Sequence, residues 1–377
     1  LASSPAILKT SGVVLSNLKW PVSVKIAVYN ASAADNANVS VSDSYTGSDG
    51  RTTMDITIDP TGNNAYTVGT ANWNSFNIGE NSTVNVKFTN HHQTSFNKVD
   101  ASGGLSQIYG HFKGISGDNC SGGCNYQSTG KVILLNPNGI LFGNGANVNI
   151  NSFTASNLKG TLTEDQRPDY EGYITLNLQK YGENELDSSV DRTYGIKVED
   201  GAEINASTNL TFAANNINLY NGSKISTNTI ALNTGFVQDP TTGKMVPTES
   251  FGKTYLVTSD GVNFAYYRHG GIKSMTNTVS DANNTAMKIN INGEIETGNL
   301  NVYNYSSNKD SEINTNNATL KAVKAAKGND GSIYFESNGR IITDNTRFTL
   351  DGNLTAKSDQ KTQFNSDPIN AGGNIYP

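Results

Sequence analysis

Hydrophobic and polar residues alternate in short runs along most of the chain, and this spacing predicts β-strands. Two early runs, residues 22–29 and 54–58, place an apolar residue at every second position. Successive side chains of a strand point to opposite faces, so each run can bury one face and expose the other. We expect these two runs to be cap strands or an antiparallel appendage. The one tolerable helical pattern, residues 318–327, is short and favours strand and loop.

A sequence unit recurs from residue 145 onward. A glycine is followed within a few residues by an apolar residue, then by a polar spacer and an apolar-x-apolar strand. Copies begin at Gly145, Gly201, Gly222, Gly293 and Gly339. The copies at Gly201 and Gly222 are separated by about one turn of a β-solenoid, whose repeats span roughly 20 to 30 residues.

Stacked copies of this unit explain both the alternation and the polar residues. Apolar side chains would point into a coil while Asn, Thr and Ser face outward, and stacking would pair the backbone N–H and C=O groups. Glycine and asparagine suit the corners because they accept positive φ at little steric cost. The prediction is an all-β chain, a right-handed parallel β-helix (a single-stranded solenoid) with N-terminal cap strands and extra-helical hairpins. An antiparallel β-sandwich is the alternative.

Two segments interrupt the rhythm and predict excursions from the coil. Residues 159–191 are rich in charge, and residues 234–284 contain a run rich in tyrosine and phenylalanine. We expect hairpins or extra strands there. No linker marks a domain boundary, so residues 1–377 are taken as one elongated domain: a cap with appended strands (1–70), a central part (71–158) and further rungs (159–377).

Composition supports a narrow core and excludes some partners. Hydrophobic residues make up 35% and charged residues 16% of the chain, below the globular averages of about 45–50% and 25%. The net charge of −6 leaves no basic field for nucleic acid. No apolar stretch reaches the roughly 20 residues of a membrane-spanning helix. Leu1 is not an initiator residue, and we expect it to be a processed or trimmed end.

The two cysteines, Cys120 and Cys124, flank a short loop with two glycines. A disulfide is the favoured interpretation, and two reduced thiols are the alternative. Zinc is less favoured because no second Cys/His pair lies at ligand spacing. A disulfide would fit an oxidising compartment.

The sequence offers little for catalysis, so we expect no enzyme, no cofactor and no metal site. The histidines are His91, His92, His111 and His269, and no motif of a hydrolase, a phosphate-binding loop or a metalloprotease occurs. Acidic clusters at 164–165 and 183–187 fall in the interrupting loops. Asn-x-Ser/Thr triplets, for example at Asn81, Asn205 and Asn221, are frequent enough in this composition to arise by chance. Exposed aromatics, Phe264, Tyr266 and Tyr267, could form a binding face, although packing is the favoured interpretation.

The segment 72–158 contains several short motifs in one order. They include the residues Trp73, Phe76, Ile78, Phe96, Asn97, Val99, Ile108 and Gly110, and then Asn136, Pro137, Asn138, Gly139 and Ile140. Asn-Pro-Asn-Gly is also an ordinary turn sequence. The order as a whole resembles the haemagglutination-activity (two-partner secretion, TPS) domain at the N-terminus of filamentous-haemagglutinin-like TpsA exoproteins. The close resemblance covers about a quarter of the chain.

The resemblance implies a domain for secretion targeting and folding nucleation. Its partner would be a TpsB-type outer-membrane β-barrel transporter with periplasmic POTRA domains, and its destination the surface or exterior of a Gram-negative bacterium. Asn136 to Ile140 match the family's Asn-Pro-Asn-Gly-Ile motif, whose side chains either contact the transporter or only stabilise the fold. The family's upstream Asn-Pro-Asn-Leu motif has no counterpart here.

The nature of the parent protein stays open at this point. We expect a surface adhesin, whose full length could bind a host-cell receptor or a carbohydrate. A haemolysin or a contact-dependent inhibition toxin would carry the same secretion signal. A β-helical polysaccharide-active enzyme is the remaining alternative.

Overall fold

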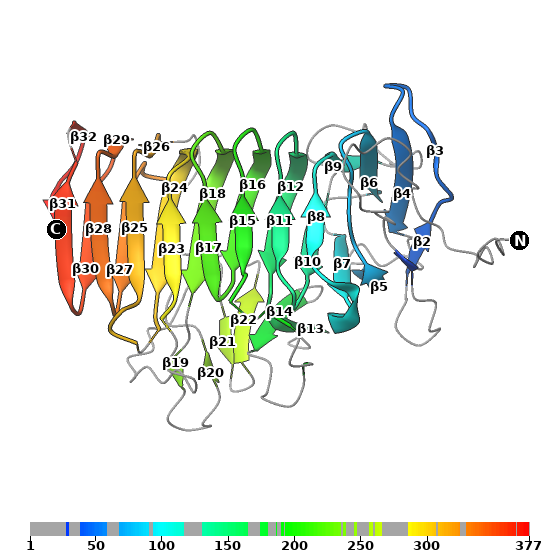
Figure 1. Ribbon diagram of the computed structural model, residues 1–377, viewed down its shortest axis with the longest axis horizontal. Coiled ribbons are helices and arrows are strands. Elements are labelled where there is room, and N and C mark those ends of the chain that lie inside the picture. Colours follow the sequence, from blue (N-terminus) through cyan, green and yellow to red (C-terminus); the bar gives the residue numbers. More distant parts are fainter. Residues whose placement is uncertain are drawn as a thin grey trace, which may run out of the picture.

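The computed structural model describes residues 28–29, 38–58, 68–89, 93–116, 130–164, 174–179, 186, 190–191, 193–234, 237–238, 245–246, 256–258, 261–265, 286–306, 308–324, 329–366 and 368–376. Strands stack side by side along the long axis of the molecule (Figure 1). Among the described residues the one helical element is the short 3-10 helix η1 (Ala101–Gly103). The parallel registers between successive turns confirm the expected parallel β-helix and rule out the antiparallel sandwich.

Each full turn of the coil crosses three parallel sheets. Sheet 1 contains β8 (Ser106–Ile108), β11 (Ile140–Phe142), β15 (Ile196–Val198), β17 (Asn216–Leu219), β23 (Lys288–Ile291), β25 (Glu312–Asn316), β28 (Arg340–Asp344) and β31 (Lys361–Asn365). Its strands are short because each spans one narrow side of the coil. An isolated bridge between Ile78 and Ile108 extends this sheet by one position toward the N-terminus.

Sheets 2 and 3 share four long strands that continue from one sheet into the other. These are β12 (Asn147–Ser156), β16 (Glu203–Ala213), β18 (Lys224–Thr234) and β24 (Glu294–Asn304). Sheet 2 adds β4 (Thr52–Ile58), β6 (Ser82–Phe88), β9 (His111–Ser116), β26 (Thr319–Ala322), β29 (Arg347–Leu350) and β32 (Ile369–Ala371). Sheet 3 adds β5 (Val68–Ser75), β7 (Thr94–Val99), β10 (Lys131–Leu135), β27 (Ile333–Ser337), β30 (Leu354–Ser358) and β33 (Ile375–Tyr376). The first half of β12 therefore pairs with β9 and its second half with β10.

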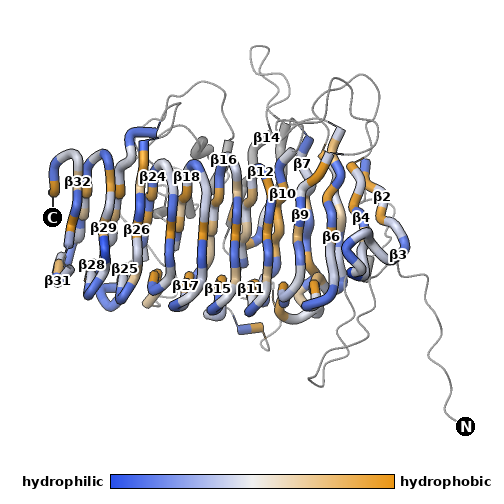
Figure 2. Tube along the Cα trace, turned by 90° about the horizontal axis from the view of Figure 1, so that it is seen from above, coloured by the Kyte–Doolittle hydropathy of each residue, from blue (hydrophilic) through white to orange (hydrophobic). Residues whose placement is uncertain are grey.

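The core is a narrow column of apolar side chains enclosed by the three sheets. Isoleucine, leucine and valine from each turn stack on the same residue types of the next turn. Apolar and polar positions alternate along the strands, as the tube coloured by hydropathy shows (Figure 2). A chain of aromatic rings with centroids 5.4–6.0 Å apart runs through the N-terminal half and contains Trp73, Phe76, Phe112, Phe153, Phe142 and Phe212.

Antiparallel strands close the N-terminal edge of the coil. β1 (Val28–Tyr29) pairs with β5, and β2 (Val39–Val41) and β3 (Tyr45–Thr46) pair with β4. The expectation for residues 54–58 was wrong in one respect: β4 also pairs in parallel with β6 and is the first strand of sheet 2. Apolar and polar residues alternate in the same way in a cap strand and in a strand of the coil. Only the strand that pairs with β4 shows which of the two it is.

The glycine-led copies lie in the coil, but not all at the same corner. Gly201 and Gly222 have φ of +75° and +83° at the turn from sheet 1 to sheet 2, and Gly293 precedes β24 at the same corner. Gly339 instead precedes β28 of sheet 1. The copy at Gly339 therefore begins at a different corner of the coil from the others. The sequence did not show this, because an apolar-x-apolar pattern fits a strand of any of the three sheets. In the segment 318–327, β26 confirms the strand at 319–322.

The two excursions form antiparallel strands outside the coil, as expected. The first gives β13 (Lys159–Glu164) and β14 (Ile174–Gln179), and the second gives β19 (Val237–Gln238), β20 (Met245–Val246), β21 (Leu256–Thr258) and β22 (Gly261–Ala265). The sequence did not reveal that β14 pairs with β22. One four-stranded sheet, in the order β13-β14-β22-β21, thus joins the two excursions.

Candidate functional site

The Asn-Pro-Asn-Gly motif forms the tight turn that leads from β10 of sheet 3 to β11 of sheet 1. The N–H of Gly139 donates to the carbonyl of Asn136 over 3.0 Å, which closes a β-turn. Gly139 has φ of +100°, and a Cβ there would lie 2.7 Å from the carbonyl oxygen of Gly195. Pro137 is buried at the second position, where its fixed φ suits the turn. The residue types of the motif therefore match the backbone that they form.

Asn136 is fully buried, and its side chain connects two turns of the coil. Its Nδ2 donates to the carbonyl of Gly104 and to Oγ of Ser106, each at 2.9 Å, in the preceding turn. Its Oδ1 accepts from the backbone N–H of Asn138 at 2.9 Å, and its own N–H donates to Ser156 of the following turn. Because buried polar groups must be paired, this asparagine fixes the register of three successive turns.

Asn138 is half-buried and adds a further bond to the preceding turn. Its Nδ2 donates to the carbonyl of Ala101, in the 3-10 helix η1, at 2.7 Å. Ile140 next to the turn is fully buried in the core. In the folded domain the amide groups of Asn136 and Asn138 are thus used inside the molecule. Asn136 cannot contact another protein without opening the turn.

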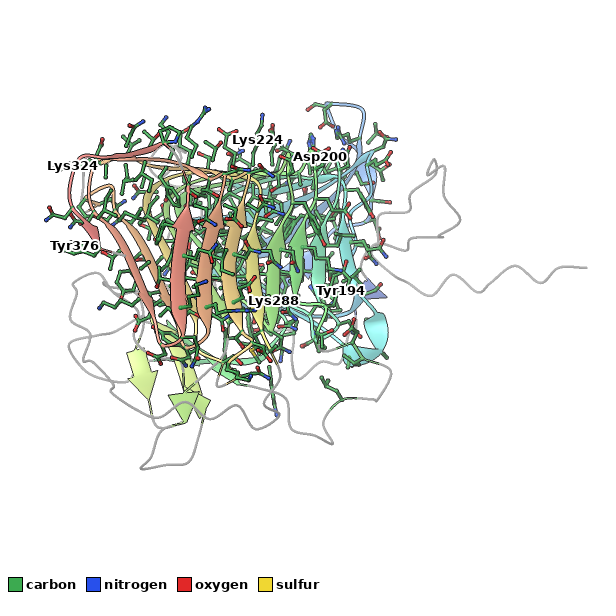
Figure 3. The ribbon with its side chains drawn as sticks, turned by 60° about the vertical axis from the view of Figure 1, so that its left-hand side comes forward. Tyr194, Asp200, Lys224, Lys288, Lys324 and Tyr376 are labelled. Atoms are coloured by element: carbon green, nitrogen blue, oxygen red, sulfur yellow. The ribbon has the colours of Figure 1, made fainter. Side chains whose placement is uncertain are left out.

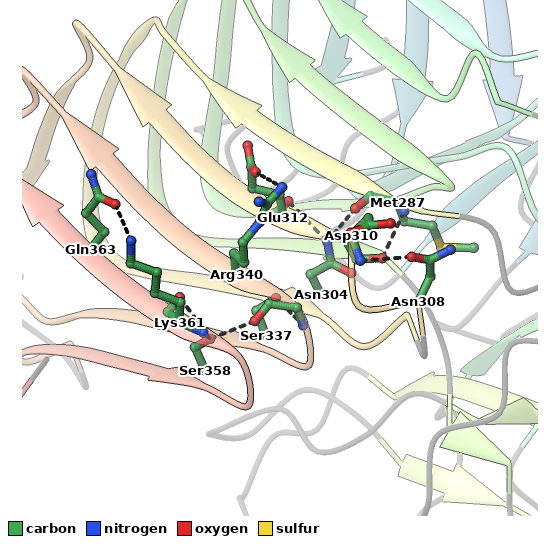
Figure 4. A network of polar contacts seen from close by, with 12 residues as sticks. Met287, Asn304, Asn308, Asp310, Glu312, Ser337, Arg340, Ser358, Lys361 and Gln363 are labelled. Atoms are coloured by element: carbon green, nitrogen blue, oxygen red, sulfur yellow. Dashed lines mark hydrogen bonds and ion pairs between the residues drawn. The ribbon is translucent and has the colours of Figure 1, made fainter.

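The same corner recurs near the C-terminal end of the coil without the full motif. Nδ2 of Asn304 donates to the carbonyls of Met287 and Glu312, and its Oδ1 accepts from the N–H of Ser306 (Figure 4). Ser337 and Ser358 follow in register and accept N–H groups two residues ahead. Several turns therefore cap this corner with a side chain, either an asparagine (Asn136 and Asn304) or a serine (Ser337 and Ser358). The Asn-Pro-Asn-Gly motif differs from these other corners by its residues Pro137 and Asn138.

Trp73 and Asn97 form a second buried polar contact within the family-type segment. The indole Nε1 of Trp73 donates to Oδ1 of Asn97 at 3.1 Å, and Nδ2 of Asn97 donates to the carbonyl of Ile133 at 3.2 Å. Both side chains are buried. The contact joins β5, β7 and β10, so it links three adjacent strands of sheet 3.

The remaining family-type residues fall into three places. Phe76, Ile78, Val99 and Ile108 lie in the core, and Gly110 lies at the corner after β8, where a Cβ would sit 2.1 Å from the carbonyl oxygen of Gly79. Phe96 points outward from sheet 3 and does not join them. It belongs to a second apolar cluster with Ile133, Leu135, Leu158, Leu178, Ala213 and Ala231. Sequence reasoning missed this cluster, although the consecutive apolar residues of β10 indicated that both of its faces are covered.

Burial shifts the pKa of two residues in this part of the coil, Lys131 and Tyr194. The mostly buried Lys131, at the start of β10, has its pKa lowered to about 8 by desolvation. Tyr194 packs against Gly139, and burial together with the nearby carboxylate of Glu199 raises the pKa of Tyr194 to about 12. Nζ of Lys197 lies 3.8 Å from the centre of the Tyr194 ring. Tyr194 precedes β15 and Asp200 follows it, so the two residues lie at opposite ends of this strand (Figure 3).

Several residues singled out in the sequence lie outside the described residues: Cys120, Cys124, His91, His92, His269, Tyr266, Tyr267, Asp165, 183–185 and Asp187. His111, in β9, has its pKa lowered by burial and by the neighbouring Arg51 and Lys113. Within the described part of the chain, no three His, Cys, Asp or Glu side chains gather as metal ligands do. The same residues contain no helix long and apolar enough to cross a membrane.

Comparison with known proteins assigns the family. The TPS secretion domain matches residues 31–250, which is more than half of the chain. Two solved structures are similar: the HMW1 secretion domain from Haemophilus influenzae (18% identity, TM-score 0.47, covering 90% of this chain and 72% of that one) and the filamentous haemagglutinin secretion domain (14%, 0.45, 93% and 100%). No curated protein matches. The chain belongs to the TPS secretion domain family, whose members are the secretion domains of exported proteins.

Proposed function

We propose that this domain is the export signal of a large surface adhesin and that a TpsB-type outer-membrane transporter recognises it through periplasmic POTRA domains. Membership of the TPS secretion domain family carries this proposal. The complete Asn136 to Ile140 turn supports it. The adhesive part, with its receptor or carbohydrate ligand, would belong to the rest of the exoprotein.

The buried state of Asn136 suggests how the motif acts. A transporter that binds the side chain of Asn136 has to contact the chain before the turn closes, while the segment is still extended. After passage, the turn closes by pairing Asn136 with Gly104 and Ser106 and by pairing Asn138 with Ala101. These bonds hold β10 and β11 on the preceding turn of the coil and provide a first template for later turns.

Folding at the cell surface can drive transport without an external energy source. Each added turn removes apolar side chains from water and pairs backbone groups, and burial is worth about 25 cal/mol per Å² of apolar surface. In a repeat fold each turn depends mainly on its neighbours, so growth can proceed in the order in which the chain emerges. A chain that has formed a stable turn outside cannot slide back easily.

Export of matched variants tests the proposal. We would express the full exoprotein with its transporter and compare Asn136→Ala/Asn138→Ala with Asn304→Ala, which removes the equivalent corner bonds far from the motif. We expect the double variant to be synthesised but retained in cells and the Asn304→Ala protein to be secreted. Normal secretion of the double variant, or equal loss for Asn304→Ala, would contradict a specific role of the motif in export.

A further inference from the structure

The corner between sheets 1 and 2 repeats one sequence step in three successive turns of the coil. Register pairing on both sides of the corner places an asparagine or an aspartate at the equivalent position of each turn, directly before a glycine. The three glycines have φ of +86°, +75° and +83°, and all six residues are exposed. The copies of this corner step are Asn144-Gly145, Asp200-Gly201 and Asn221-Gly222.

Each of the first two copies is held by the turn that follows it. The N–H of Gly145 donates to the carbonyl of Gly201, and the N–H of Gly201 donates to the carbonyl of Gly222, both over 3.2 Å. The asparagine side chain takes part as well, since Nδ2 of Asn144 donates to the carbonyl of Asp200 over 3.0 Å. The glycine N–H of each of these two copies, and the amide of Asn144, are thus used within the molecule.

Asn221-Gly222 is the last copy, and the following turn does not hold it. Four residues, 220–223, connect β17 to β18, but only Asn292 and Gly293 connect β23 to β24 in the next turn. The shorter corner has no carbonyl in the place where Gly222 would need one. Among the described residues, neither the N–H of Gly222 nor the side chain of Asn221 has a hydrogen-bond partner. Both groups are therefore open to water and free to move against each other.

We propose that Asn221 is a site of spontaneous covalent modification in the folded domain, at which its side-chain amide is exchanged for a carboxylate. The backbone nitrogen of Gly222 bonds to Cγ of Asn221 and closes a cyclic imide. The proton of that nitrogen passes through solvent to the side-chain nitrogen, which leaves as ammonia. Water then opens the imide at either carbonyl and leaves aspartate or isoaspartate. Glycine favours the ring closure because no Cβ stands beside the attacking nitrogen.

Folding protects the other Asn-Gly steps of the chain. The glycine N–H donates to a backbone carbonyl in two of them and to Oγ of Ser337 in a third. In the fourth, Gly293 is buried, and a Cβ there would lie 2.1 Å from Oγ of Ser223. A nitrogen that is hydrogen-bonded or shielded from water cannot readily lose its proton and attack. These protected steps are Asn138-Gly139, Asn144-Gly145, Asn338-Gly339 and Asn292-Gly293.

Asn144 is the matched control for Asn221, because it has the same following residue, the same corner and an exposed side chain. The purified chain would be incubated at mildly alkaline pH, and peptide mass spectrometry would follow aspartate and isoaspartate at both positions. We expect Asn221 to react at least about tenfold faster, because two hydrogen bonds must open before Asn144 can react. In urea the two rates should become similar. Equal rates in the folded domain, or a difference that persists in urea, would overturn the inference.

A variant with a longer corner tests the cause. Asn292 and Gly293 would be replaced by Glu-Asp-Gly-Ala, the sequence of residues 199–202, so that the next turn offers a glycine carbonyl to Gly222. Circular dichroism would establish that the variant folds. We expect modification of Asn221 to slow toward the rate of Asn144, and an unchanged rate in the folded variant would also overturn the inference.

Discussion

Nε1 of Trp73 lies 3.1 Å from Oδ1 of Asn97, and both side chains are buried inside the coil. The two residues are on adjacent strands of sheet 3, and Asn97 bonds onward to β10. A polar pair at this depth is stable only while both partners are present, because an unpaired buried group loses water without compensation.

Loss of the indole donor should therefore destabilise the domain. Trp73→Phe leaves Oδ1 of Asn97 buried without its donor, and we expect the free energy of unfolding to fall by about 1–3 kcal/mol, plus the cost of the smaller ring. Urea unfolding followed by circular dichroism measures this change. The combined variant Trp73→Phe/Asn97→Leu should recover part of the loss. If the two effects simply add, the hydrogen bond is not the cause.

Gly139 offers a matched comparison with Gly50. Both have positive φ, at +100° and +76°, but a Cβ at Gly139 meets the Tyr194 ring and the carbonyl of Gly195, whereas a Cβ at Gly50 meets nothing within 4 Å. Gly50→Ala should cost only the left-handed strain of about 1–2 kcal/mol. Gly139→Ala should lower the free energy of unfolding by clearly more than this, and thermal unfolding of both variants measures the difference. Equal costs would show that the turn can shift away from Tyr194.

Lys131 predicts a dependence of stability on alkaline pH. Its pKa of about 8 in the folded domain lies below the usual 10.5. Between these values the unfolded chain holds a proton that the folded domain has released, so the free energy of unfolding should rise with pH across this window. Below pH 8 the full cost of burying the charge is present. Urea unfolding at several pH values should show a smaller rise for Lys131→Met, and an identical rise in both proteins would refute the assignment.

Asp55 anchors the cap to the first turns of the coil. Its carboxylate accepts from Oη of Tyr45 at 3.0 Å and from Nδ2 of Asn85 at 2.9 Å, and it pairs with Nζ of Lys87 at 2.7 Å. Asp55→Ala should lower the free energy of unfolding by about 2 kcal/mol and speed amide hydrogen exchange in β2 to β4. Asp49→Ala, at an exposed neighbour, should change little. Unchanged exchange in the Asp55 variant would mean that backbone pairing alone holds the cap.

The sequence by itself determined the fold class, the excursions and the family. Period-two alternation and glycine-led repeats are local properties, and stacking of identical strands satisfies both, so they favoured the parallel coil over the antiparallel sandwich. The ordered motifs from Trp73 to Ile140 identified a secretion domain. The local sequence also predicts where the backbone needs an unusual conformation, such as the positive φ of Gly139.

Tertiary structure decided what depends on contacts between distant segments. Only stacking shows that Asn136 is buried against Gly104 and Ser106, because its partners belong to another turn of the coil. The pairing of β14 with β22 joins two excursions that no local pattern connects. Whether an alternating strand is a cap or a rung, as for β4, depends on the strand beside it. Alternation tells which side chains can be buried, and the packed neighbours decide what buries them.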